Sequence, residues 1–133
     1  MARAALARTR LACKSPTATE QMDSILSWIA TASMAGEAWL RHTTPDKYTS
    51  QTLDLSHDSL LDISSTLFKS LPSGIDSASL DSVITRSTGH VALMAKLVEQ
   101  KNAPDFRILL DSLYSEERVV KQLADSIEAR EKQ

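Results

Sequence analysis

The sequence has few of the residues that tight turns and covalent cross-links require. It contains 3 glycines and 4 prolines in 133 residues, whereas a β-sandwich or barrel needs a turn about every ten residues, usually built with Gly, Pro or Asn. The single cysteine, Cys13, excludes an internal disulfide and a thiolate zinc site. These absences argue against an all-β fold and leave side-chain packing as the source of stability.

Long apolar runs are absent as well. Hydrophobic residues make up 42% and charged residues 24% of the chain, which is typical of a globular domain. Its most apolar stretch, residues 25–40, is interrupted by four polar or charged residues: Ser27, Thr31, Ser33 and Glu37. The sequence therefore predicts no membrane span. A chain of this length has room for one core, and we predict a single domain over residues 18–133.

The net charge of −2 hides an uneven distribution. Residues 1–17 form a basic N-terminal arm without acidic residues, predicted to be extended or loosely helical, whose four cations are Arg3, Arg8, Arg10 and Lys14. The arm lacks the apolar run of a secretory signal, and its arginines and small residues are typical of a mitochondrial presequence. We expect an intracellular protein and favour the mitochondrion. The alternative is a cytoplasmic protein with a basic tail.

Beyond the arm, apolar residues recur every three or four positions in four segments, which is the period of amphipathic helices. The first helix is predicted over residues 18–42, because Thr17 and Glu20 have capping-box spacing and Pro45 ends the pattern. Further helices are predicted over 57–71, from Asp76 or Ser77 to the residues before 102, and from Pro104 onward. Together they predict an all-α, four-helix bundle.

Three details of this bundle depend on weaker signals. Residues 46–56 are polar and lack a helical period, which predicts a loop with an extended stretch at 52–55 at most. Gly89 lies inside the third helix and is predicted to weaken it by roughly 1 kcal/mol relative to alanine. Ser115 has the features of a fresh N-cap, so an alternative is a last helix that is kinked or split at Tyr114.

The three histidines, His42, His57 and His90, lack the spacing of a catalytic or metal site. The Glu-x-x-His pairs of bundle metal centres are absent, and Asp54-x-x-His57 is the nearest analogue. Asp54 is followed at spacing four by Asp58 and Asp62, and we favour a solvated acidic face for these three carboxylates. Whether the chain is an enzyme stays open. We favour a non-enzymatic protein and assign no catalytic residue, cofactor or metal ligand, with a small helical enzyme or metal protein as the alternative.

Two individual histidines have structural interpretations. His90 shares a row with Val83 and Leu97, seven residues apart on either side, which predicts a buried or half-buried structural histidine. His42 is predicted to serve as a cation at the end of the first helix.

Nucleic-acid binding is a further alternative that we consider unfavourable. The segment 81–99 has only a faint helix-turn-helix rhythm around Gly89, and a continuous helix explains it better. Residues 20–133 are acidic in total and would repel phosphate, so only the arm could contact nucleic acid. A regulator that uses its arm in this way stays an alternative.

The first helix is apolar over more than half of its circumference, because a second stripe contains Trp28, Ala32, Ala35 and Trp39. One interpretation is a helix at the centre of the bundle. The other is that Trp28 or Trp39 anchors a protein partner or a second copy in a homo-oligomer. The predicted function is a non-catalytic protein–protein interaction module, a small accessory or adaptor subunit of a larger assembly. Its predicted partner-binding residues are these two tryptophans and the four arm cations.

Overall fold

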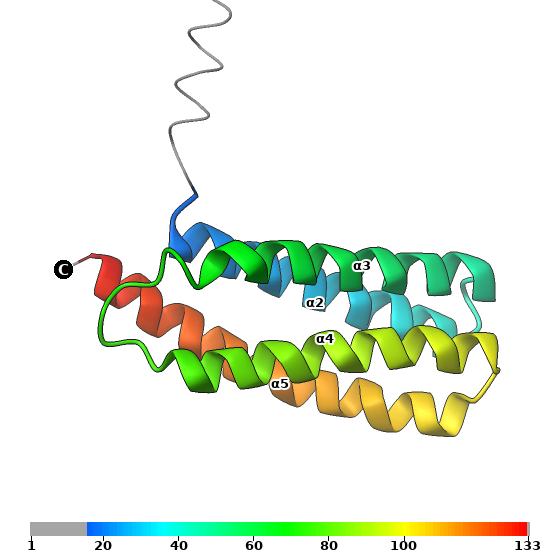
Figure 1. The fold of residues 1–133 in the computed structure, drawn as a ribbon. Coiled ribbons are helices and arrows are strands. Elements are labelled where there is room, and N and C mark those ends of the chain that lie inside the picture. The colour runs from blue at the N-terminus through cyan, green and yellow to red at the C-terminus, as the bar shows by residue number, and fades with distance from the viewer. Residues whose placement is uncertain (1–15, 133) are drawn as a thin grey trace, which may run out of the picture.

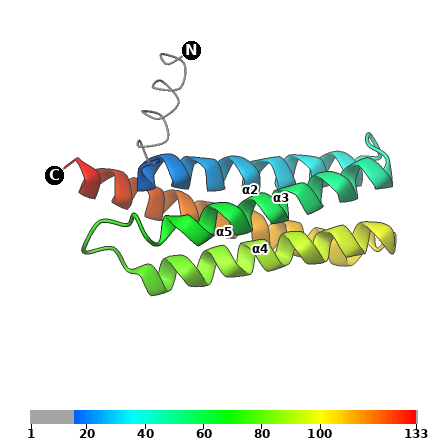
Figure 2. The ribbon, with the colours of Figure 1, turned by 45° about the horizontal axis from the view of Figure 1, so that its top comes forward.

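The computed structural model describes residues 16–132, which form four helices and no strand. The helices are α2 (Ala18–Leu40), α3 (Asp46–Leu67), α4 (Ser77–Glu99) and α5 (Ala103–Glu131). Each helix packs along the next one in sequence, and α5 returns to lie beside α2 (Figure 1). Figure 2 shows the same antiparallel bundle from another side. The predicted all-α, four-helix bundle is confirmed. The predictions for residues 1–15, including all four arm cations, lie outside the described residues.

Hydrogen bonds confirm the predicted caps of α2 and α4, and α5 has proline in its first turn as predicted. At α2, Thr17 Oγ1 accepts from Glu20 N at 3.1 Å, and Glu20 Oε1 accepts from Thr17 N at 2.8 Å, which completes the capping box. Asp76 caps α4 by accepting from the amide of Ser79 at 3.1 Å. Asn102 caps α5 in the same way, with proline in the first turn. These caps satisfy amides that have no partner inside the helix.

The predicted loop over residues 46–56 is wrong, because α3 begins at Asp46 and ends at Leu67 rather than at 71. Its first half is buried through Thr49, Ser50, Leu53 and Ser56, which recur at helical spacing. Hydroxyl groups can be buried there because they donate to carbonyls one turn back, as Ser56 Oγ does to Thr52 O at 2.9 Å. A search for apolar periodicity overlooks a face made largely of small polar residues.

The last helix is continuous, so the alternative of a split at Tyr114 is also wrong. Residues Ala103–Glu131 form one helix of 29 residues, and Ser115 lies within it rather than capping a new one. The apolar stripe does not change direction at this point, because Leu113 and Val120 are both fully buried.

At the end of α2 the prediction is two residues too long. There, Arg41 is the C-cap and His42 has a positive φ of 61°.

The core lies along the bundle axis, where the apolar stripes of all four helices meet. Part of this core joins α2 closely to α5. A Cβ atom at Gly36 would lie 3.0 Å from Phe106 Cζ, and the rings of Trp39 and Phe106 are 4.8 Å apart. Glycine at this position therefore lets the two helices approach each other at the core.

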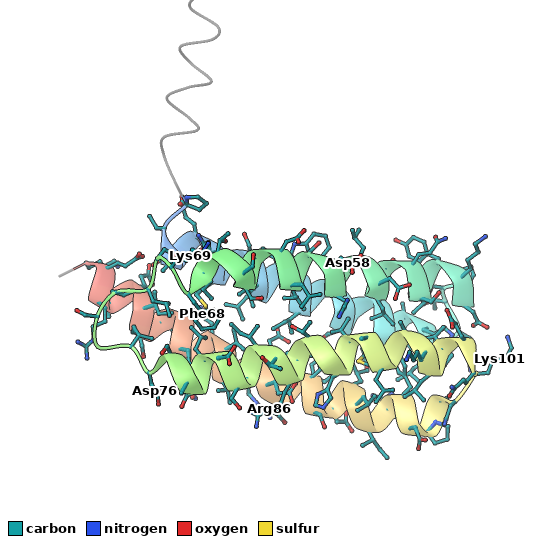
Figure 3. All side chains as sticks on the ribbon, viewed as in Figure 1. Asp58, Phe68, Lys69, Asp76, Arg86 and Lys101 are labelled. Atoms are coloured by element: carbon teal, nitrogen blue, oxygen red, sulfur yellow. The ribbon has the colours of Figure 1, made fainter. Side chains whose placement is uncertain are left out.

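Polar contacts connect the helices at both ends of the bundle. At one end, Glu131 of α5 accepts from the amides of Ala18 and Thr19, each at 3.1 Å, and from the Thr19 hydroxyl. At the other end, Asp46 accepts from Trp39 Nε1 at 2.7 Å and from Lys101 Nζ at 2.6 Å. Figure 3 shows Lys101 at the turn between α4 and α5.

None of the helices in residues 16–132 combines the length and apolar character needed to cross a bilayer.

Candidate functional site: the groove between α2 and α5

Two adjoining hollows form an open groove between α2 and α5, which we call the α2/α5 groove. The first hollow, of about 1010 Å³, extends from Leu26 to Ala30 on α2. The second, of about 490 Å³, continues past Met34 to the end of the helix. Ala30, Tyr114 and Glu117 line both hollows. The groove therefore follows most of the length of α2.

Short side chains on α2 leave this groove open. Ala30, Ser33 and Ala38 line it, and none of them is long enough to cover α5. Met34 lies among them with 72% of its surface exposed, which is the largest exposure of any large apolar residue among the described ones. A run of small residues beside an exposed apolar side chain is a surface suited to close approach by another helix.

The floor of the groove contains a polar group with unused hydrogen-bonding capacity. Ser33 is only 3% exposed, and its hydroxyl oxygen has no hydrogen-bond partner among the described residues. Other buried hydroxyls, such as Thr88 Oγ1 bonded to Ile84 O at 2.7 Å, donate to a carbonyl one turn back. An orphaned buried hydroxyl is unusual in folded proteins and costs stability.

Two titratable groups of α5 border the same floor. Burial raises the pKa of Glu117, which has no hydrogen bond or ion pair within residues 16–132. Burial also raises the pKa of Tyr114, and the negative charge of Glu37 adds to this effect. The carboxylate of Glu117 is thus partly removed from water without a compensating cation.

Most cations near the groove are already engaged. Glu37 pairs with Arg41 at 3.5 Å and with Arg107 at 3.0 Å. Lys121 is one helical turn from both Glu117 and Asp125, and it pairs with Asp125 at 3.4 Å. The remaining cation, Arg118, lines the first hollow but not the second.

On its other side, α5 packs against α4. His90 of α4 is half-buried in this contact, as predicted. Its Nδ1 lies 3.1 Å from each carboxylate oxygen of Glu116, and Ser87 Oγ lies 3.2 Å from Glu116 Oε1. Ser87 bonds to the carboxylate and to the carbonyl of Val83, not to the imidazole, so the three groups lack the arrangement of a nucleophile and its base. They form a structural polar cluster. Sequence reasoning missed Glu116, because it is 26 positions from His90 and on another helix.

The other sequence candidates do not come together. Within residues 16–132, the one hydrogen bond or ion pair of the His57 side chain is with its neighbour Asp58, at 3.2 Å, and Asp58 is exposed on the outer side of α3 (Figure 3). Asp54 and Asp62 are exposed as well, which is the solvated face that the sequence favoured. Within residues 16–132, no group of three or more His, Cys, Asp or Glu side chains is placed to hold a metal ion.

The structure places both tryptophans against the core. Trp39 is 8% exposed, and its indole nitrogen donates to Asp46. Trp28 is partly buried and packs against the core cluster. Their stripe is therefore used largely inside the bundle, in agreement with a helix that packs on two neighbours. Partner binding through these tryptophans stays a prediction.

Comparisons with protein-family models, with curated proteins and with solved structures found no match for the chain.

Proposed function

We propose that the chain is a non-catalytic protein–protein interaction module, a small accessory or adaptor subunit of a larger assembly, and that it receives a partner helix in the α2/α5 groove. One observation supports this proposal above the others: the floor of the groove contains the buried, unpartnered hydroxyl of Ser33 beside the exposed side chain of Met34. An unsatisfied buried hydroxyl costs about 1–3 kcal/mol. A partner that supplied its hydrogen bond would recover part of this free energy.

The spacing of the lining residues suits a helical partner. Leu26, Ala30 and Met34 follow one another at intervals of four on α2, so they form one ridge. The small residue lies between two large ones, which creates a hole along the ridge. A side chain of a third helix can fill such a hole, as in knobs-into-holes packing.

The location of the protein is part of the same proposal. We propose an intracellular protein and favour the mitochondrion, because residues 1–17 have the composition of a presequence. Fusion of these residues to a fluorescent reporter tests this directly. Mitochondrial import that is lost when Arg3, Arg8 and Arg10 become glutamine would agree with the proposal, and a reporter that stays in the cytosol would contradict the mitochondrial part.

Affinity capture with one groove variant and one control tests the interaction proposal. Ala30→Arg fills the groove from a position that lines both hollows, whereas Leu55→Arg adds the same charge at an exposed site on α3. We expect a stoichiometric partner with the wild-type and Leu55→Arg chains and its loss with Ala30→Arg, at unchanged thermal midpoints. Equal capture by all three chains, or no stoichiometric partner with any of them, would contradict the proposal.

A further inference from the structure

Helix α5 presents a glutamate to each of its two neighbours, and each neighbour presents a buried serine. Adjacent positions on a helix point about 100° apart, so Glu116 contacts α4 whereas Glu117 borders the groove toward α2. In the α4 contact, Glu116 bonds to Ser87 and to His90. In the α2 contact, Glu117 and Ser33 line the same hollow, and neither has a partner among the described residues.

The α2 contact lacks the free nitrogen donor that the α4 contact has. The α4 side combines a carboxylate, a hydroxyl and a nitrogen donor from an imidazole, so the buried carboxylate is compensated. The second hollow of the groove is lined by Glu117 and Ser33, and by a second carboxylate, Glu37, but by no imidazole. Its own arginine, Arg41, is paired with Glu37. A nitrogen donor with a positive charge would complete the set on this side.

We propose that the hollow lined by Ser33 and Glu117 binds an ammonium or guanidinium group on an aliphatic stem, and that this group is a lysine or arginine side chain of the partner helix. The inference rests on the proposed function. The N–H groups would donate to the Glu117 carboxylate and to Ser33 Oγ. The methylene stem would lie on Ala30 and Met34, because long cationic side chains bury their stems on apolar surface.

The size of the groove favours a side chain of a protein over a free amine. The hollow with Ser33 is continuous with the larger one at Leu26, since both are lined by Ala30 and Glu117. A small alkylamine would leave that larger space empty. A helix that inserts one cation beside Glu117 would also cover Leu26 with its next turns.

Nuclear magnetic resonance titrations with three probes of equal length test the chemistry of the hollow: hexylammonium, hexanoate and 1-hexanol. Hexylammonium should shift the amide signals of residues 30–38 and 114–118, and the anion should not. Glu117→Gln should weaken this binding about fivefold or more, because it removes a partly buried charge. Ser33→Ala should weaken it less. Glu99→Gln, an exposed carboxylate on α4, serves as the matched control and should change nothing.

Two amphipathic peptides that differ only by one lysine replaced with glutamine test the source of the cation. The lysine peptide should bind more tightly than hexylammonium and more tightly than its glutamine twin, and Glu117→Gln should abolish the difference between the peptides. Equal binding of all three small probes, no localised shift, or equal binding by Glu117→Gln would overturn the cation site. Tighter binding of the free amine than of the lysine peptide would overturn the assignment to a protein side chain.

These outcomes separate the inference from the proposed function. If Ala30→Arg abolishes partner capture and hexylammonium does not bind at Glu117, the interaction module stands and the cation site fails. If hexylammonium binds and Ala30→Arg leaves partner capture unchanged, the proposed function fails, and with it the assignment to a partner helix.

Discussion

On its α4 side, α5 buries Glu116 against His90 and Ser87, whereas on its α2 side Glu117 and Ser33 have no partners within residues 16–132. Both contacts join antiparallel helices of one bundle and use the same two residue types. The α4 contact is satisfied within the chain, as is usual for buried polar groups. The α2 contact has unused hydrogen-bonding capacity beside an open groove. This contrast between the two contacts is the basis of our proposal that another molecule completes the α2 surface.

The largest expected contrast concerns the two adjacent glutamates. Glu116→Ala should lower the free energy of unfolding by about 2–3 kcal/mol, because it leaves the half-buried His90 without its partner. Glu117→Ala should change it by about 0.5 kcal/mol or less, since no contact within the described residues is lost. Urea denaturation of both variants measures the difference. Equal losses would show that Glu117 is a structural residue and would remove the contrast.

Alanine substitutions at two helical glycines, Gly36 and Gly89, should change the stability of the protein in opposite directions. Gly36→Ala should destabilise the protein by about 1 kcal/mol, because its Cβ would press on the fully buried ring of Phe106. Gly89→Ala should stabilise it by up to about 1 kcal/mol, because nothing lies within 4 Å and alanine favours the helix. Denaturant midpoints of the two variants should move in opposite directions. A stabilising Gly36→Ala would show that the core contact between α2 and α5 is loose.

The two buried serines should respond differently to the same truncation. Ser87→Ala removes a hydroxyl that bonds to Val83 O and to Glu116, so it should cost about 1 kcal/mol. Ser33→Ala removes a hydroxyl without a partner and should stabilise the protein by about 0.5–1 kcal/mol. Thermal midpoints by circular dichroism measure both changes. A loss of stability in Ser33→Ala would reveal that the hydroxyl has a partner in the free protein.

The smallest effects concern pH, where two glutamates of α5 act in opposite directions. The hydroxyl and amide of Thr19 and the amide of Ala18 lower the pKa of Glu131 below its ordinary value of 4.5. Its contribution to stability is therefore present above that value and is lost as the pH falls through the lower folded-state pKa. Burial raises the pKa of Glu117 above the same ordinary value. Its ionisation therefore reduces stability as the pH rises from 4.5 through the higher folded-state pKa.

Thermal midpoints measured from about pH 3 to about pH 7 check both signs. Glu131→Gln should reduce the loss of stability on the acid side. Glu117→Gln should remove a small decline above pH 4.5 and leave the acid side unchanged. Parallel profiles of wild type and both variants would contradict the two assignments.

Much of the fold could be predicted from the sequence, because local signals decide where three of the helices begin. The capping box at Thr17, the cap at Asp76 and the proline after Asn102 depend only on neighbouring residues. The start of α3 could not be predicted in this way. Its buried face contains Thr49, Ser50 and Ser56, whose hydroxyls are satisfied by the helix itself, so apolar periodicity underestimates its burial.

The candidate site could be predicted only in part. The sequence correctly indicated that His90 is buried or half-buried. It directed attention to Trp28 and Trp39, which pack on the core, rather than to Ala30, Ser33 and Met34. The groove depends on which α2 residues face α5, and the pairing of Glu116 with His90 depends on the register of α4 and α5. The spacing of residues within one helix determines neither the face that α2 turns toward α5 nor the register of α4 against α5.

Site-specific photo-crosslinking tests most directly the claim that the α2/α5 groove receives a partner. A photoreactive amino acid at Met34 would lie in the groove, and one at Leu61 would lie at an exposed apolar site on α3. The proposal predicts one discrete adduct from position 34, which disappears when Ala30→Arg is added, and none from position 61. Adducts of equal yield from both positions, or an adduct at 34 that persists with Ala30→Arg, would contradict it.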